Sequence, residues 1–157
     1  MKKQFLALCT LPLFALAAHA QNTPGKAEYF SAQDIQKQLA DLAPKAQSEG
    51  SSGSTLGDYT SHQLKLSVRT SSGGAEVHAH YDDVFVVTQG QATLITGGTV
   101  VDGKTGADGE TKGSGIRDGN THVISTGDMV HIPAGTPHQL KIAQGTLFST
   151  IVVKVKE

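Results

Sequence analysis

Several residue types that often identify a protein's chemistry are scarce in this sequence. It has no tryptophan, one cysteine and two arginines among 157 residues, and aromatic residues make up only 5%. Because Cys9 is the only cysteine, the chain can form neither an internal disulfide bond nor a structural zinc site built on cysteine thiolates. The scarcity of aromatic and arginine side chains also leaves no clear anchor for a substrate.

The N-terminus has the three parts of a secretory signal peptide. Lys2 and Lys3 form a positively charged start, residues 5–18 are mostly apolar, and residues 18–20 (Ala-His-Ala) supply the small residues that precede a cleavage site. The apolar stretch is too short to span a bilayer. We therefore expect residues 1–20 to be removed and the protein to be periplasmic or secreted, without membrane contact after cleavage. A buried N-terminal helix is the alternative.

Charge and length limit the partners and the number of domains. Loss of two lysines from the 13 basic residues leaves 11 against 14 acidic ones, a net charge of about −3. An acidic chain is a poor partner for nucleic acid or for an anionic membrane surface. Removal of 20 of the 157 residues leaves 137, which is enough for one domain with a hydrophobic core but not for two.

One helix is predicted, over residues 31–43. Ser31 can cap its start, and apolar residues recur through it at helical spacing. Pro44 is expected to end the helix, and the Ser- and Gly-rich residues 48–57 have the composition of a linker. Residues 21–57 are therefore interpreted as a leader, a helix and a linker.

The remainder of the chain, residues 58–157, has the pattern of a β-domain. Apolar and polar residues alternate over residues 64–69, as in a half-buried strand, and residues 84–87 form a continuous apolar run. Many short strands with frequent glycine turns indicate a β-sandwich or β-barrel. Further strands are predicted at residues 92–95, 122–125, 129–132 and 147–155.

A glycine-rich insertion interrupts this domain at residues 97–119. It contains eight glycines mixed with acidic and basic residues. Long loops in compact domains are often functional or disordered. The insertion could be a lid over a pocket, but we favour a surface hairpin with partial order.

The residues that indicate a chemistry lie in two short segments about fifty residues apart. Residues i and i+2 of a strand point to the same face, so His78 and His80 would present two imidazoles side by side, with Glu76 one step further out. Asp83 follows a short turn and opens the next strand, and His138 follows a turn shaped by prolines and a glycine. Two or three imidazoles with one carboxylate suit Fe, Mn, Ni, Cu or Zn, and leave coordination positions open for water or substrate.

These two segments resemble the paired motifs of the cupin superfamily. The first motif has a His-x-His pair, then a glutamate, then six residues and a glycine, and residues 78–80, Asp83 and Gly90 follow that order. The second motif, Gly-x5-Pro-x-Gly-x2-His-x3-Asn, is matched in order and spacing by Gly127, Pro133, Gly135 and His138. The resemblance implies an all-β fold, a jelly-roll β-barrel over residues 58–157 with one N-terminal helix before it. It also implies a divalent transition metal held by His78, His80, Asp83 and His138.

The departures from the motifs concern the carboxylate. Asp83 replaces the usual glutamate, is one methylene shorter and stands one or two residues closer to His80 than usual. Ile142 replaces the final asparagine, which is not a ligand. Glu76 could replace Asp83 as a ligand, act as a base near the pocket mouth, or be an exposed carboxylate at a strand edge.

The resemblance does not define one reaction, because cupins include several classes of enzyme as well as binding modules. Our first hypothesis is an exported metal-dependent enzyme acting on a small organic molecule, of dioxygenase, decarboxylase, isomerase or lyase type. Glu76 and Tyr81 are its candidate proton-transfer groups. The alternative is a non-catalytic module that binds a metal or a small ligand. Cupins commonly pair, so a homodimer is expected. Arg69 and Lys141 are candidate anion contacts only if they point inward.

Overall fold

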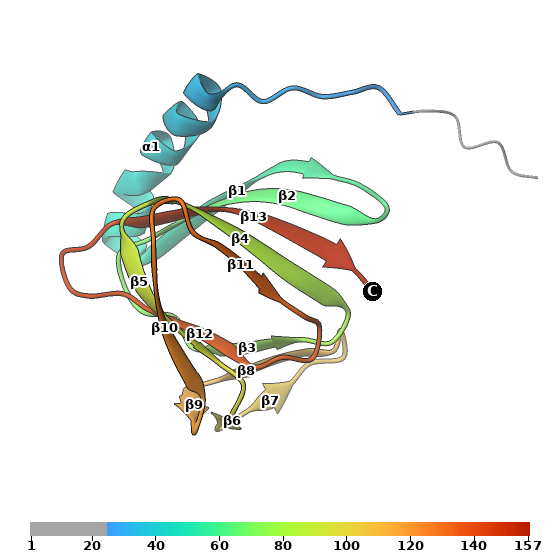
Figure 1. The fold of residues 1–157 in the computed structure, drawn as a ribbon, viewed down its shortest axis with the longest axis vertical. Coiled ribbons are helices and arrows are strands. Elements are labelled where there is room, and N and C mark those ends of the chain that lie inside the picture. Colours follow the sequence, from blue (N-terminus) through green and yellow to red (C-terminus); the bar gives the residue numbers. More distant parts are fainter. Residues whose placement is uncertain (1–24) are drawn as a thin grey trace, which may run out of the picture.

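The structure, a computed structural model, describes residues 25–157 and consists mostly of antiparallel β-strands with one N-terminal helix (Figure 1). The predicted all-β class with a preceding helix is confirmed. The predicted signal peptide lies outside the described residues. Within them, no helix combines the length and the apolar character needed to cross a membrane.

The elements are α1 (Ala32–Glu49), β1 (Ser51–Asp58), β2 (His62–Arg69), β3 (Ala75–His78), β4 (Tyr81–Gln89), β5 (Gln91–Thr96), β6 (Thr99–Val101), β7 (Lys104–Thr105), β8 (Glu110–Gly113), β9 (Gly115–Arg117), β10 (Asn120–Ser125), β11 (Met129–Ile132), β12 (His138–Lys141) and β13 (Phe148–Lys156).

Two antiparallel sheets face each other and form the barrel. One sheet has the order β1-β2-β13-β4-β11, and the other has the order β10-β5-β12-β3-β8-β7. Strands β6 and β9 form a separate pair at the end of the molecule away from α1 (Figure 1). Because β3 and β4 are consecutive but belong to different sheets, the segment between them turns from one wall of the barrel to the other.

The helix is longer than the sequence predicts. Its start is as expected, since the Ser31 hydroxyl accepts a hydrogen bond of 3.0 Å from the backbone N–H of Asp34. The prediction that Pro44 ends it is wrong, because α1 continues through the proline to Glu49. A proline removes one helical hydrogen bond, but Ala46 beyond it is fully buried against the sheet. The helix ends at Gly50, whose φ of 85° is the left-handed conformation typical of a C-cap.

Two segments expected to be irregular are strands. The region predicted as a linker includes β1, which pairs with β2 over its whole length. The glycine-rich insertion contributes β6 to β9, of which β8 pairs with β3 and so extends the second sheet beside the first histidine segment. The insertion is therefore an ordered hairpin-like addition to the barrel wall.

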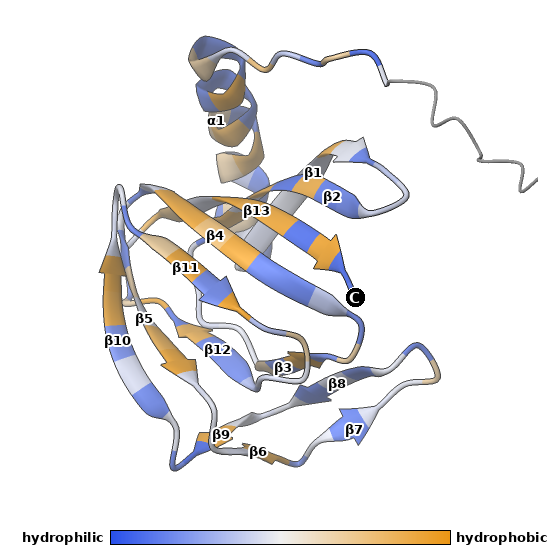
Figure 2. Cartoon of the chain, turned by 45° about the vertical axis from the view of Figure 1, so that its right-hand side comes forward, coloured by the Kyte–Doolittle hydropathy of each residue, from blue (hydrophilic) through white to orange (hydrophobic). Residues whose placement is uncertain are grey.

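The apolar side chains form two separate clusters, one between the sheets and one under α1. The cluster between the sheets includes Phe85, Leu94, Leu140 and Phe148. The second cluster joins Leu39 and Ala46 of the helix to Leu66 and Val68 of β2. In Figure 2, β4 changes from apolar to hydrophilic toward its start, where the polar residues of the barrel lie.

Strand β2 is amphipathic, and its apolar face points away from the barrel interior. Its apolar residues face outward under α1, and its polar residues Lys65, Ser67 and Arg69 face the barrel interior. The predicted alternation over residues 64–69 is confirmed, but the apolar face is covered by the helix and not by the opposite sheet.

We expect Leu66→Ala to lower the free energy of unfolding by about 2–5 kcal/mol, because it removes a side chain that is only 1% exposed between α1 and β2. Urea denaturation followed by circular dichroism measures this change. Val123→Ala is the matched control, since Val123 is 61% exposed and its truncation should change stability by no more than about 0.5 kcal/mol. Equal effects of the two substitutions would contradict the packing of α1 on β2.

Candidate metal centre

A polar cavity of about 330 Å³ lies inside the barrel, between the two sheets. Its charged and histidine lining residues are Lys65, Arg69, Glu76, His78, Asp83, Glu110, Lys112, His138 and Lys154.

Glu76, His78 and His138 form a group in which one possible ligand atom from each residue lies within 4.8 Å of the others. Strands β3 and β12 are antiparallel neighbours, and Glu76 is the register partner of His138. His78 is two residues from Glu76 on the same strand, so its side chain points to the same face. The ladder between β3 and β12 thus brings a carboxylate and two imidazoles together.

His78 lies between two carboxylates. Its Nδ1 is hydrogen-bonded to the Glu110 carboxylate from β8, and its Nε2 lies 3.2 Å from Asp83 Oδ2. Burial alone would lower the pKa of His78, but the contacts with Asp83 and Glu110 outweigh it and raise the pKa above its usual value of 6.5. In this structure the histidine is therefore more readily protonated than an exposed one.

The pKa of His138 is shifted in the opposite direction from that of His78. The Nδ1 of His138 donates to the backbone carbonyl of Thr136 at 3.1 Å, which leaves Nε2 as an acceptor. Burial lowers the pKa of His138, so the ring is neutral at pH 7. Its Nε2 is buried and has no hydrogen-bond partner among the described residues. A buried acceptor without a partner is costly, which indicates that this nitrogen takes a ligand.

Asp83 reaches the two histidines from the opposite sheet. Its Oδ2 lies 3.2 Å from His78 Nε2 and 3.7 Å from His138 Nε2, and its Oδ1 accepts a hydrogen bond of 2.7 Å from Lys154. Burial would raise the pKa of Asp83, but His78 and Lys154 lower it below its usual value. The carboxylate is ionised, and one of its oxygens is already used by the lysine.

The turn that delivers His138 is tied to the strands that carry the other groups. Asp82 Oδ1 accepts a hydrogen bond of 2.7 Å from the backbone N–H of Ala134, and its Oδ2 contacts His131 at 2.9 Å. The N–H of Gly135, at a φ of 75°, donates to the carbonyl of His78. Asp82 therefore fixes the second motif against the first.

The structure does not bring two of the predicted residues into this cluster. Strand β3 ends at His78, so the alternation expected for His80 no longer applies, and His80 lies exposed in the bend between β3 and β4. Tyr81 begins β4 and borders a separate surface hollow with Asp58 and His62, away from the central cavity. His131 is likewise outside the cavity, where its side chain is 58% exposed.

Sequence reasoning missed Glu110 and Lys154, which contact the cluster directly. Glu110 belongs to the insertion, and only the pairing of β8 with β3, in which Glu110 faces His78, brings it to the site. Lys154 is the register partner of Asp83 in the ladder between β13 and β4. The sequence signal for Lys154 is its position between Val153 and Val155, which places its side chain on the opposite face of the strand from the two valines.

The chemistry of this donor set fits a divalent transition metal. Two imidazoles and a carboxylate match the ligands that Fe, Mn, Ni, Cu and Zn take in proteins. Each imidazole is also held through its other nitrogen, by the Glu110 carboxylate or the Thr136 carbonyl, as metal-ligating histidines usually are.

Comparisons with known proteins identify the fold but not the function. No family model and no curated protein matches the sequence. An uncharacterised protein with a double-stranded β-helix domain from Klebsiella pneumoniae superposes with a TM-score of 0.57 at 14% identity, covering 83% of this chain and 90% of that one. The cupin domain of Schizosaccharomyces pombe Cnp3 gives a TM-score of 0.52 at 9% identity, covering 69% of this chain and 66% of that chain.

The DMSP lyase DddQ of Ruegeria pomeroyi gives a TM-score of 0.51 at 14% identity, covering 69% of this chain. This chain spans only about half of the length of DddQ, with 48% covered. The fold of the chain is that of the cupin superfamily, as the two motifs predict.

We expect Asp82→Ala to lower the melting temperature, because it removes the hydrogen bonds that Ala134 and His131 make with the Asp82 carboxylate. Calorimetry measures the change, and hydrogen exchange at residues 133–137 should rise with it. Asp41→Ala, which removes only a surface ion pair with Lys37, is the control and should leave both readouts nearly unchanged. Unchanged exchange in the turn would show that Asp82 does not fix it.

Proposed function

We propose that this protein is a metal-binding cupin that takes a small organic molecule in its barrel. In this proposal Glu76, His78 and His138 are the metal ligands. The observation that carries it is the buried Nε2 of His138, which has no partner among the described residues and lies in a group with a carboxylate and a second imidazole.

Glu76, and not Asp83, is the carboxylate ligand in this proposal. Glu76 belongs to the group of closely spaced ligand atoms, whereas Asp83 is engaged by Lys154. Asp83 Oδ2 remains within 3.7 Å of both histidines, so it can orient them or accept a proton from bound water. The sequence leaves the choice between the two carboxylates open, and we propose Glu76. The proposed ligand set omits His80 because that residue is exposed.

A divalent transition metal in this position would supply Lewis acidity to an oxygen of the bound molecule or activate a water. The residues of the chain supply orientation and shielding. Glu110 and Thr136 hold the two imidazoles through Nδ1, and Phe85, at 6% exposed, gives the cavity an apolar wall beside His138. Such a site suits dioxygenase, decarboxylase, isomerase or lyase chemistry, and the fold alone does not choose among them.

A second candidate function is a non-catalytic module that binds a small ligand. It is supported by the pairing of charged side chains within the cluster. His78 can hold a proton between Asp83 and Glu110, and Lys154 neutralises the remaining charge of Asp83. In that case the raised pKa of His78 reflects a stable ion-pair network and not a ligand awaiting a metal.

Two further parts of the proposal rest on the sequence. Residues 1–20 are proposed as a signal peptide, which would make the protein periplasmic or secreted. A homodimer is proposed from the resemblance to cupins alone.

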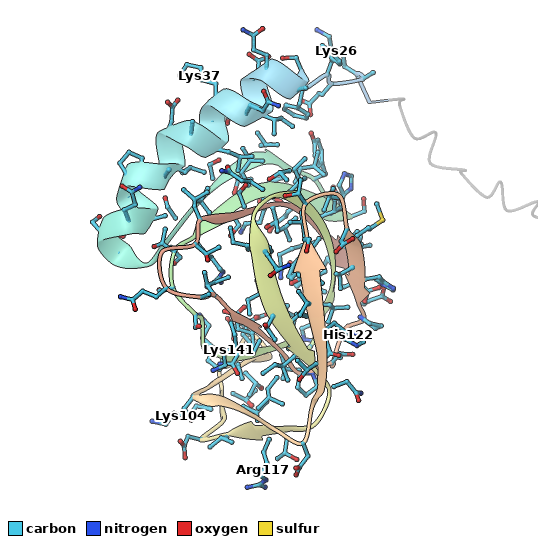
Figure 3. All side chains as sticks on the ribbon, turned by 60° about the vertical axis from the view of Figure 1, so that its left-hand side comes forward. Lys26, Lys37, Lys104, Arg117, His122 and Lys141 are labelled. Atoms are coloured by element: carbon cyan, nitrogen blue, oxygen red, sulfur yellow. The ribbon has the colours of Figure 1, made fainter. Side chains whose placement is uncertain are left out.

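The metal assignment predicts that the protein, purified from the compartment to which it is exported, carries one transition-metal ion per chain. Elemental mass spectrometry measures this content. His138→Ala should lose that metal together with the rise in melting temperature that the metal gives the wild-type protein, since a ligand that binds the folded state stabilises it. His122→Ala is the matched control, because His122 is an exposed histidine of β10 (Figure 3). Absence of bound metal, with no stabilisation by any added divalent ion, would refute the metal hypothesis and favour the binding module.

The contact between Glu110 and His78 predicts a graded effect. Glu110→Ala should weaken metal binding by about 10–100-fold while leaving the ligands in place, because it removes the carboxylate that orients the imidazole. Competition with a chromophoric chelator measures the affinity. Glu49→Ala, on the exposed surface of α1, should leave it unchanged. Equal affinities of the wild-type and Glu110→Ala proteins would contradict this orienting role of Glu110.

A further inference from the structure

We propose that the molecule taken into the barrel carries a carboxylate and that this carboxylate is held by Arg69 and Lys65 on β2. The inference rests on the proposed function for the location of the ligand and adds its chemical class. Both cations line the same cavity as the histidine cluster.

The direction of the β2 side chains is the first observation. Lys65, Ser67 and Arg69 are two residues apart on one strand, so they share one face, and that face forms part of the cavity wall. The apolar face of the strand is covered by α1 instead. A barrel strand that packs its apolar side outward and lines the interior with two cations indicates that the interior receives a negatively charged group.

The protein itself does not neutralise these two cations. Within residues 25–157, neither Lys65 nor Arg69 makes an ion pair or a side-chain hydrogen bond, although both are only partly exposed. Removing a cation from water without a partner is unfavourable. Lys154, another lysine of the cavity, differs in this respect, since its ammonium group lies 2.7 Å from Asp83 Oδ1.

Two of the three acidic residues that line the cavity are paired with other side chains. Asp83 contacts Lys154 and His78, and Glu110 contacts His78. Glu76 belongs to the proposed ligand group and faces the exposed Lys112 across the ladder between β3 and β8. An anionic group on the ligand is therefore the available counter-charge for β2.

The shape of the site favours a carboxylate on a small, mostly aliphatic molecule. The guanidinium of Arg69 lies beside Gly73, where a Cβ would come within 2.8 Å of Nη1, so the glycine leaves the space in which the guanidinium sits. A planar guanidinium can bind a carboxylate through two parallel hydrogen bonds. The cavity of about 330 Å³ has Phe85 as its only aromatic lining residue, so it offers little surface for stacking an aromatic ring.

Isothermal titration calorimetry with acetate, succinate, glutarate and benzoate tests the proposal. All titrations are done at constant ionic strength, and succinamide serves as the uncharged counterpart of succinate. Each acid is titrated into protein dialysed against a chelator and into protein supplied with Zn²⁺ or Mn²⁺. Binding to the metal-free protein does not require the proposed metal, so failure of the metal hypothesis and failure of this proposal give different results. Inorganic phosphate is titrated in parallel.

We expect at least one of the acids to bind the wild-type protein, and Arg69→Gln and Lys65→Met each to weaken that binding by about tenfold or more. Arg117→Gln is the matched control, because Arg117 is the other arginine of the chain and projects from the far end of the insertion (Figure 3). Unchanged melting temperatures of the ligand-free variants would show that they remain folded.

Three results would overturn the proposal. The first is the absence of binding by all four acids with and without metal. The second is binding that is equally strong in the wild-type, Arg69→Gln and Lys65→Met proteins. The third is binding of phosphate as tight as that of the best acid with the same dependence on Arg69, which would make the site a phosphate site.

Discussion

The register between β3 and β12 is the constraint on which the site depends. It pairs Glu76 with His138, and His78 joins them from two residues further along β3. A slip of one residue would turn a whole strand's set of side chains to the other face. The turn before His138 resists such a slip, because its backbone is bonded to the carbonyl of His78 and to the side chain of Asp82. Hydrogen bonds between the two motifs thus hold Glu76, His78 and His138 together.

Charge is distributed unevenly along the cavity, and both proposals follow from this. Around the histidines, the Asp83 and Glu110 carboxylates each have a partner, whereas the buried Nε2 of His138 has none among the described residues. On the β2 wall the unsatisfied groups are the two cations, Lys65 and Arg69. A metal at one position and a carboxylate at the other would complete the polar contacts of one barrel interior.

Much of this could be predicted from the sequence, because the glycines, prolines and histidines of the two motifs act locally. Motif spacing predicted the barrel fold, which is confirmed, and it named His78 and His138, which lie together in the cavity. The i, i+2 rule failed for His80 because β3 ends at His78, a boundary that no residue type marks. Glu110 and Lys154 reach the cluster only through pairing with β3 and β4, which sequence periodicity cannot reveal. The sequence named Arg69 as an anion contact only on the condition that it points inward, and it did not single out Lys65. Alternation shows that the two faces of β2 differ but not which one α1 will cover.

X-ray absorption spectroscopy of the metal-loaded protein tests the central claim most directly, because it counts imidazole ligands at the bound ion. The account predicts two imidazole nitrogens, from His78 and His138, together with carboxylate or water oxygens, and the spectrum should be unaffected by His80→Ala. A third imidazole that disappears in His80→Ala would contradict the assignment, as would a metal environment without imidazole.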